Sequence, residues 1–173
     1  MFDYNLVTNK LNLNNKYEHT NCFLCVKYLN LNSDSYLLCS GTDGCIIIWK
    51  FDKDEIFLFN KIESIHQSGI NSFDTWKIND NKILIASVGD DTLVSVTELE
   101  LSNKSNQVSI IKKEMANASS IASVKFLNRN IFATISKDQR LILWNYENKL
   151  VSNFFQKIEN FYYILKNFLS LQS

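Results

Sequence analysis

The chain has 173 residues, 46% of them apolar and 21% charged, so it can bury a core and is not wholly disordered. Eighteen basic and eighteen acidic side chains give a net charge of zero, which excludes the strong positive field of a protein that binds nucleic acid by itself. The sequence shows neither a signal-peptide pattern nor the roughly 18 consecutive apolar residues that span a bilayer, so we expect a cytoplasmic protein without membrane contact.

Residues 1–18 carry the weak pattern of one edge strand, because Leu6, Leu11 and Leu13 are separated by polar residues. Three longer units follow, over residues 19–65, 66–116 and 117–156. Each unit contains four short apolar runs separated by turn residues, which predicts four strands. The expected strands are 23–28, 35–40, 45–51 and 56–62; 70–76, 82–87, 92–99 and 108–113; and 121–127, 130–135, 140–146 and 149–155.

The tail, residues 157–173, has a different periodicity. From Ile158 its apolar residues recur at three and four positions, as in Phe161 and Leu165, which predicts a short helix of about twelve residues. Such a helix could cover the flank of the third unit or bind a partner. The alternative is an extension with accidental periodicity.

The units repeat at a fixed period. Their third apolar runs end 48 and then 47 residues apart, and an aspartate lies six positions before each end: the pairs are Asp43 and Trp49, Asp91 and Thr97, Asp138 and Trp144. Four short strands per period favour a propeller blade over an α/β unit or a helical repeat. Phe2 lies 47 residues before Trp49, so residues 1–18 are expected to be the outer strand of a preceding blade. The predicted fold class is an all-β partial propeller of about three blades.

These motifs resemble the WD-repeat family. In that family a histidine before the first strand, a serine or threonine late in the second, an aspartate in the next turn and a tryptophan ending the third form a buried hydrogen-bonded network. The resemblance assigns this structural role to His19, Asp43 and Trp49; to His66, Ser87 and Asp91, with Thr97 replacing the tryptophan; and to Thr134, Asp138 and Trp144, with Asn117 replacing the histidine. No blade has the complete set.

A narrower resemblance lies within residues 66–144. The segments HQSGINS at 66–72, ASVGDD at 86–91 and SKDQRLILW at 136–144 are similar to the C-terminal blades of the WD-repeat protein six family. Proteins of that family are non-catalytic partners of the methyltransferase that modifies the ribose 2′-hydroxyl at the tRNA wobble position. The resemblance implies a methyltransferase as the protein partner and tRNA contact through the complex.

No enzyme motif is evident. The sequence lacks G-x-S-x-G, a phosphate-binding P-loop and the dinucleotide fingerprint, so we expect neither catalysis nor a cofactor. Cys22 and Cys25 have C-x-x-C spacing, but they lie in an expected strand with no second ligand pair nearby. We therefore interpret these two cysteines, together with Cys39 and Cys45, as free thiols and not as part of a metal or redox site.

Binding is the remaining class of function. Candidate partner-binding residues are polar or aromatic positions near turns: Gln67, Trp76, Lys77, Arg129, Gln139 and Arg140. Trp76 could instead pack in the core. A closed propeller has four to eight blades, so a general adaptor in trafficking, signalling or ubiquitin ligation and a truncated propeller fragment remain alternatives to the methyltransferase scaffold.

Overall fold

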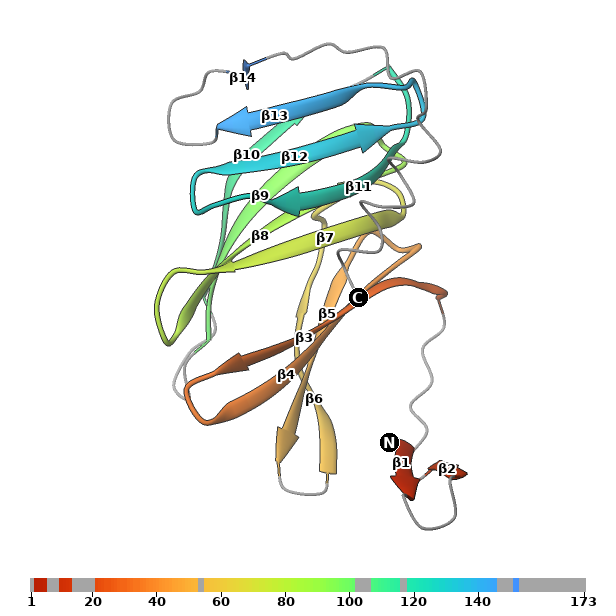
Figure 1. The fold of residues 1–173 in the computed structure, drawn as a ribbon, viewed down its shortest axis with the longest axis vertical. Coiled ribbons are helices and arrows are strands. Elements are labelled where there is room, and N and C mark those ends of the chain that lie inside the picture. The colour runs from red at the N-terminus through yellow and green to blue at the C-terminus, as the bar shows by residue number, and fades with distance from the viewer. Residues whose placement is uncertain are drawn as a thin grey trace.

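The computed structural model describes residues 2–5, 10–13, 21–52, 55–101, 107–115, 118–145 and 151–152, and every regular element in these ranges is a β-strand (Figure 1). The strands are β1 Phe2–Asn5, β2 Lys10–Leu13, β3 Phe23–Leu31, β4 Asp34–Gly41, β5 Ile46–Asp52, β6 Glu55–Ile62, β7 Ile70–Lys77, β8 Lys82–Gly89, β9 Leu93–Glu100, β10 Gln107–Met115, β11 Ile121–Phe126, β12 Ile131–Ser136, β13 Leu141–Asn145 and β14 Val151–Ser152. Strands β3 to β14 overlap one by one with the strands expected from the sequence. The all-β class is confirmed.

Strands β3 to β14 form three antiparallel sheets of four strands. We call them blade 1 (β3 to β6), blade 2 (β7 to β10) and blade 3 (β11 to β14). Strands adjacent in sequence are adjacent in the sheet, so each blade is a meander of hairpins. The blades stack in chain order, and β7 lies between β3 and β11 (Figure 1). This arrangement confirms a partial propeller of three four-stranded blades.

The blades repeat the same local irregularities. A register shift interrupts the pairing of each first strand with the second at the same place, between Phe23 and Cys25, Ile70 and Ser72, and Ile121 and Ser123. The residue after each turn aspartate has a left-handed backbone, with φ of 72° at Gly44, 65° at Thr92 and 65° at Gln139. At Gly44 a Cβ would lie only 2.4 Å from the His66 carbonyl oxygen, so the turn of blade 1 tolerates only glycine beside the start of blade 2.

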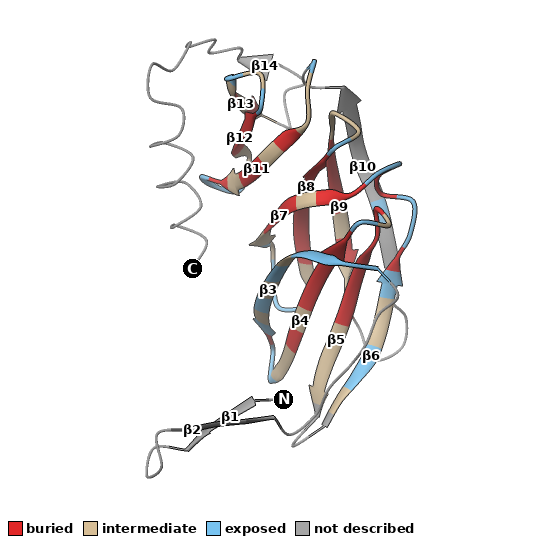
Figure 2. Ribbon diagram, turned by 90° about the vertical axis from the view of Figure 1, so that its right-hand side faces the viewer, coloured by how far each residue is buried: buried red, intermediate tan, exposed pale blue. Residues whose placement is uncertain are grey.

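Apolar side chains fill the space between successive blades. Much of β4, β7 and β8 is accordingly coloured as buried in Figure 2. Side chains alternate along β8, so that Ile83 and Ile85 pack against blade 1 while Leu84 and Ala86 pack against blade 3. Blade 1 contributes Leu38 to the first of these cores. Blade 2 is thus buried on both faces, which explains the nearly continuous apolar run of β8.

Among the described residues, blade 1 has one uncovered face. The register places Val26, Phe73 and Val124 at equivalent positions opposite Cys39, Ser87 and Thr134. Phe73 is 2% and Val124 0% exposed because the preceding blade covers them, whereas Val26 is 62% exposed. Phe23, Leu24 and Tyr28 on the same strand are also exposed. Strand β3 is accordingly coloured mainly as exposed in Figure 2. Blade 1 therefore presents an apolar sheet surface of the kind that blades 2 and 3 bury.

The two ends of the chain were predicted as an outer strand and a helix. Strands β1 and β2 pair with each other, from Phe2 opposite Leu13 to Asn5 opposite Lys10, in a separate two-stranded sheet. The assignment of residues 1–18 to a preceding blade, like the limits of the units, stays a prediction. The expected helix in residues 157–173 lies outside the described residues. Within the described ranges no helix has the length and apolarity needed to cross a membrane.

The repeat provides a matched pair of variants for testing the open face. Val124→Ala removes two carbons from a buried side chain and should lower the free energy of unfolding by about 2 kcal/mol, from lost burial and the cavity left behind. Val26→Ala makes the same change at the exposed equivalent position and should change that free energy by less than about 0.5 kcal/mol. Urea denaturation followed by tryptophan fluorescence measures both. Equal losses in the two variants would mean that the open face is covered in solution.

Candidate functional site

Blade 2 contains a buried polar network at the start of its first strand. His66 precedes β7, Ser87 lies on β8, and Asp91 lies in the turn before β9. His66 Nδ1 donates to the two Asp91 oxygens at 2.8 and 3.0 Å, and its Nε2 lies 3.0 Å from Ser87 Oγ. The amides of Gln67 and Leu93 donate to the same carboxylate at 2.9 and 3.1 Å. The structure thus brings together the three residues that the sequence assigned to this blade.

The carboxylate of Asp91 is stabilised in its charged form. Burial alone would raise the pKa of Asp91, but the hydrogen bonds from His66 and from the two amides outweigh it and lower the pKa below its usual value. A carboxylate held in this way links the segment before β7 to the turn between β8 and β9. The network therefore fixes the end of the blade.

The order Asp91, His66, Ser87 also has the geometry of a catalytic triad. Ser87 is 0% exposed on a central strand, between the two apolar cores, and no substrate carbonyl could reach its hydroxyl without opening the blade. A nucleophile must reach its substrate. The arrangement is therefore structural in the folded chain.

Blade 3 forms a different part of the same network. Trp144 Nε1 donates to Thr134 Oγ1 at 2.9 Å, and the Ser136 hydroxyl donates to Asp138. In blade 2 Thr97 occupies the position of Trp144, and its buried Oγ1 has no hydrogen-bond partner among the described residues. Blade 2 therefore lacks the tryptophan donor that the second-strand hydroxyl has in blade 3.

Blade 1 lies partly outside the described residues. Its predicted histidine, His19, falls in a range that the structure does not describe. Asp43 accepts a hydrogen bond from the Cys45 amide at 3.3 Å, and Lys61 Nζ lies 3.8 Å from its second oxygen. Trp49 is half-buried on β5.

The six predicted partner-binding residues lie at opposite ends of the blades. Gln67, Gln139 and Arg140 are exposed where the first strands begin. Lys77 and Arg129 are exposed where the first strands end, and Lys77 pairs with Asp80 at 2.7 Å. Trp76 is half-buried and packs on the core between blades 2 and 3, with its ring 6.3 Å from that of Phe126. The six residues therefore do not form one surface.

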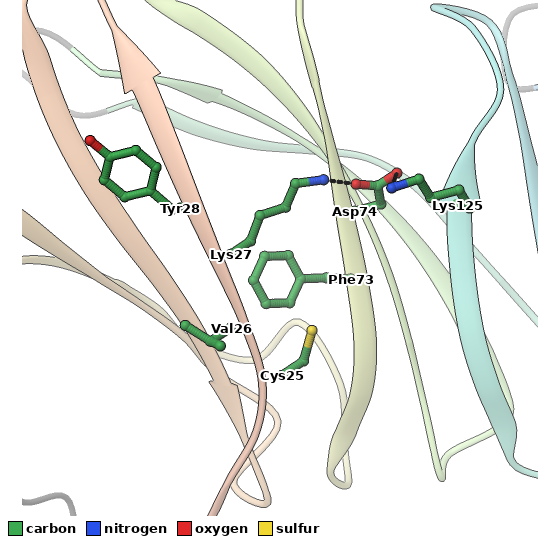
Figure 3. Close-up of a pocket in the computed structure, with 7 residues that line it drawn as sticks. All are labelled: Cys25, Val26, Lys27, Tyr28, Phe73, Asp74 and Lys125. Atoms are coloured by element: carbon green, nitrogen blue, oxygen red, sulfur yellow. Dashed lines mark hydrogen bonds and ion pairs between the residues drawn. The ribbon is translucent and has the colours of Figure 1, made fainter. Parts of the chain in front are cut away.

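A cavity of about 260 Å³ lies along the first strands and contains charged residues that the sequence analysis missed (Figure 3). Lys27 of β3 and Lys125 of β11 approach the carboxylate of Asp74 on β7 from its two sides. Lys27 forms an ion pair with Asp74 Oδ1, and Lys125 Nζ lies 3.7 Å from Oδ2. The three residues immediately follow Val26, Phe73 and Val124, so the alignment of the first strands was the signal that could have found them.

Asp74 is held by the backbone as well. The Thr75 amide donates to Oδ1 at 2.9 Å, and the Phe126 amide of blade 3 donates to Oδ2 at 2.8 Å. Burial lowers the pKa of Lys27 to about 8, and the charge of Lys125 acts in the same direction. Burial likewise raises the pKa of the neighbouring Cys25 thiol, which disfavours the thiolate. Asp74 therefore joins three blades and lies between two partly buried cations.

The four cysteines are free thiols: Cys22 is exposed, Cys25 half-buried, and Cys39 and Cys45 buried. Within the ranges that the structure describes, no group of three histidine, cysteine, aspartate or glutamate side chains could hold a metal ion. The chemistry visible at the cavity is that of charge pairing and apolar contact.

Comparison with known proteins gives a family match over part of the chain and one relative of greater length. Residues 12–50 match the family described as WD domain, G-beta repeat. Over 126 residues, 70% of its length, the chain is also 29% identical to cilia- and flagella-associated protein 57 C of Tetrahymena thermophila. The aligned part is only 9% of that protein, so this chain corresponds to a small portion of the relative.

The blade 2 network predicts a specific loss of stability in acid. Since the folded-state pKa of Asp91 lies below its unfolded value, the carboxylate stabilises the folded chain above about pH 4 and stops doing so as the pH falls through the folded-state pKa. Asp91→Asn should lower the free energy of unfolding by about 1–3 kcal/mol at pH 7, because the ionised acceptor is lost. The difference from the unsubstituted chain should shrink at lower pH.

Urea denaturation of both proteins between pH 3 and 7 measures this difference. Asp90→Asn is the control, because Asp90 also has a lowered pKa but is exposed and hydrogen bonds mainly to Asn71 and Ser120. A difference between Asp91→Asn and the unsubstituted chain that stays constant over this pH range would contradict the role given to Asp91.

The three charges at the cavity, those of Lys27, Asp74 and Lys125, predict a second loss of stability. Asp74→Asn leaves two partly buried ammonium groups facing a neutral amide and should lower the free energy of unfolding by about 3 kcal/mol. Asp80→Asn is the control, since the exposed pair that it breaks should contribute at most about 1 kcal/mol. Thermal denaturation followed by circular dichroism tests both variants. Similar losses in the two would show that Asp74 does not join the blades.

Proposed function

We propose that this chain is a non-catalytic scaffold that binds a protein partner. The observation that carries the proposal is the cavity along the first strands, where apolar side chains and the three charges of Lys27, Asp74 and Lys125 meet. The burial of Ser87 and His66 supports the same conclusion, because it removes the only Ser-His-Asp arrangement in the described residues from contact with a substrate.

The partner that we propose is a tRNA ribose 2′-O-methyltransferase. Support comes from the resemblance of segments 66–72, 86–91 and 136–144 to the partner subunit of such an enzyme. Each of these segments contains a residue of the polar networks described above: His66, Asp91 and Asp138. In this proposal tRNA is bound by the complex of the chain with its partner. The zero net charge of the chain does not favour tRNA binding by the chain alone.

A ciliary or flagellar adaptor is the second candidate. It is favoured by the relative from Tetrahymena thermophila, whose name associates it with cilia and flagella. The chain covers 9% of that relative, so this role is carried over from a much longer protein. Both candidates are specific cases of a general adaptor that binds other proteins.

One experiment separates the candidates. The tagged full chain is captured from cells, and tRNA nucleosides are analysed by mass spectrometry in cells with and without the gene. Recovery of a methyltransferase together with loss of the wobble ribose methyl group is the expected result. An unchanged methyl level with no methyltransferase would contradict it, and recovery of ciliary proteins in that case would favour the second candidate.

Two candidate faces can be tested in the same capture. Gln67, Gln139 and Arg140 define one end of the blades, and Lys77 and Arg129 define the other. Alanine substitution of one set should reduce partner recovery while the other set leaves it unchanged. Unchanged partner recovery with both sets of substitutions would mean that neither end of the blades binds the partner, and would favour the cavity as the binding site.

A further inference from the structure

Blades 1 and 3 share a short sequence on their first strands. Residues 26–28 of β3 read Val-Lys-Tyr, and residues 124–126 of β11 read Val-Lys-Phe, so the two segments differ by one hydroxyl group. Both segments lie at the edge of their sheet and at the same place in the register with the second strand. The surface that covers residues 124–126 therefore shows what kind of surface fits residues 26–28.

Strand β7 covers the segment of blade 3 with three alternate side chains. The Val124 amide donates to Ser72 Oγ at 3.4 Å, and the Phe126 amide donates to Asp74 Oδ2 at 2.8 Å. The Trp76 ring lies 6.3 Å from the ring of Phe126. Because side chains two residues apart project from the same face of a strand, one face of β7 supplies a hydroxyl, a carboxylate and an aromatic ring.

The lysine in the middle of each segment makes the next amide depend on another strand. In blade 2 the Thr75 amide donates to its own neighbour, Asp74, at 2.9 Å. A lysine side chain has no acceptor, so the amide that follows Lys125 donates to Asp74 of the preceding blade instead. Blade 1 has Lys27 at this position, and within the described ranges no side chain accepts the amide of Tyr28.

The segment of blade 1 is accessible. Val26 is 62% and Tyr28 55% exposed, against 0% for Val124 and 6% for Phe126. Val26 and Tyr28 point away from β7, while Lys27 points toward it (Figure 3). A strand laid along this edge of β3 can therefore contact both exposed side chains and the Tyr28 amide.

We propose that residues 26–28 bind a β-strand of a partner protein that carries a hydroxyl, a carboxylate and an aromatic side chain at alternate positions. The carboxylate accepts from the Tyr28 amide, as Asp74 does in blade 3, and the aromatic ring packs on Tyr28, as Trp76 packs on the equivalent phenylalanine. Charge-assisted hydrogen bonds and aromatic pairs give such a contact both orientation and affinity. This inference rests on the proposed scaffold function and names the surface and the chemistry by which the partner is recognised.

A second copy of this chain does not present such a strand in the described residues. Its β7 carries the three side chains, but Ser72 is 2% and Asp74 3% exposed, and both already accept from blade 3. Its other two first strands have a lysine, Lys27 or Lys125, in place of the carboxylate. The partner is therefore a different protein.

The peptide INSFDTWK with blocked ends is the probe, because it copies residues 70–77 of β7, and its matched control has alanine in place of the aspartate. Titration of the full chain, followed by amide shifts in two-dimensional NMR, should show millimolar binding that moves the resonances of Val26 and Tyr28. Those of Val124 and Phe126 should stay in place, since β7 covers them. The alanine peptide should bind at least about tenfold more weakly, because it lacks the charged acceptor. Equal binding of the two peptides, or binding of neither, overturns the proposal.

Variants of exposed residues test the surface. Tyr28→Glu removes the ring and places a negative charge beside the peptide carboxylate, so it should weaken binding at least about tenfold, whereas Tyr28→Phe should retain most of it. Leu127→Glu makes the same charge change on blade 3, at a side chain that is also 55% exposed, and should have no effect. Circular dichroism establishes that each variant is folded, and Val26→Glu provides a second test if Tyr28→Glu does not fold. Unchanged binding in the folded Tyr28→Glu, or loss of binding in Leu127→Glu, contradicts the site.

The cellular capture distinguishes this inference from the proposed function. A partner recovered equally by the unsubstituted chain and by Tyr28→Glu leaves the scaffold function standing and overturns this surface as its site. Peptide binding without any captured partner supports the site and contradicts the scaffold function. Sedimentation of the chain alone should show a monomer. A dimer that Tyr28→Glu abolishes would mean that a second copy covers the surface, and would overturn the choice of partner.

Discussion

The need to cover both apolar faces of blade 2 governs this structure. A four-stranded antiparallel sheet can leave one face to water, but β8 is buried on both, with alternate side chains in two separate cores. Blade 2 is therefore stable only between two neighbours, and its aliphatic composition follows from that position. The same constraint explains why the first strands carry large apolar residues at equivalent places, and why the one on blade 1 lies open in the described residues.

Polar residues in this fold are used where the strands end and where the first strands meet. His66 and Asp91 join two segments at the end of blade 2. Although the residue set has catalytic geometry, its burial gives it a structural role, which is to hold these segments together. Asp74 acts between blades, because its acceptors are shared by β3, β7 and β11. Buried carboxylates need donors at both oxygens, and the two sites supply them in different ways, with an imidazole in one and ammonium groups in the other.

The sequence predicted the strands well because turn residues and apolar runs alternate at a short spacing, and the 47-residue period gave independent support at each unit. It also placed His66, Ser87 and Asp91 in one network, which the family resemblance implied. It missed Lys27, Asp74 and Lys125, because charged residues in a strand are ordinarily solvated and only the superposition of three first strands brings them together. The six partner-binding candidates were chosen by residue type near turns, and residue type does not tell which end of a blade a turn occupies. His19 and the tail beyond Ser152 lie outside the described residues, so those predictions stand as they were.

The position of Asp74 also bears on how the chain assembles during synthesis. Lys27 leaves the ribosome 47 residues before its carboxylate partner, and Lys125 follows Asp74 by a further 51 residues. Blade 1 alone would leave Lys27 without its counter-charge on β7, and a pair of blades would still lack the Phe126 amide. Each blade thus completes a contact that the previous one left open, so the nascent chain gains stability in steps and not all at once.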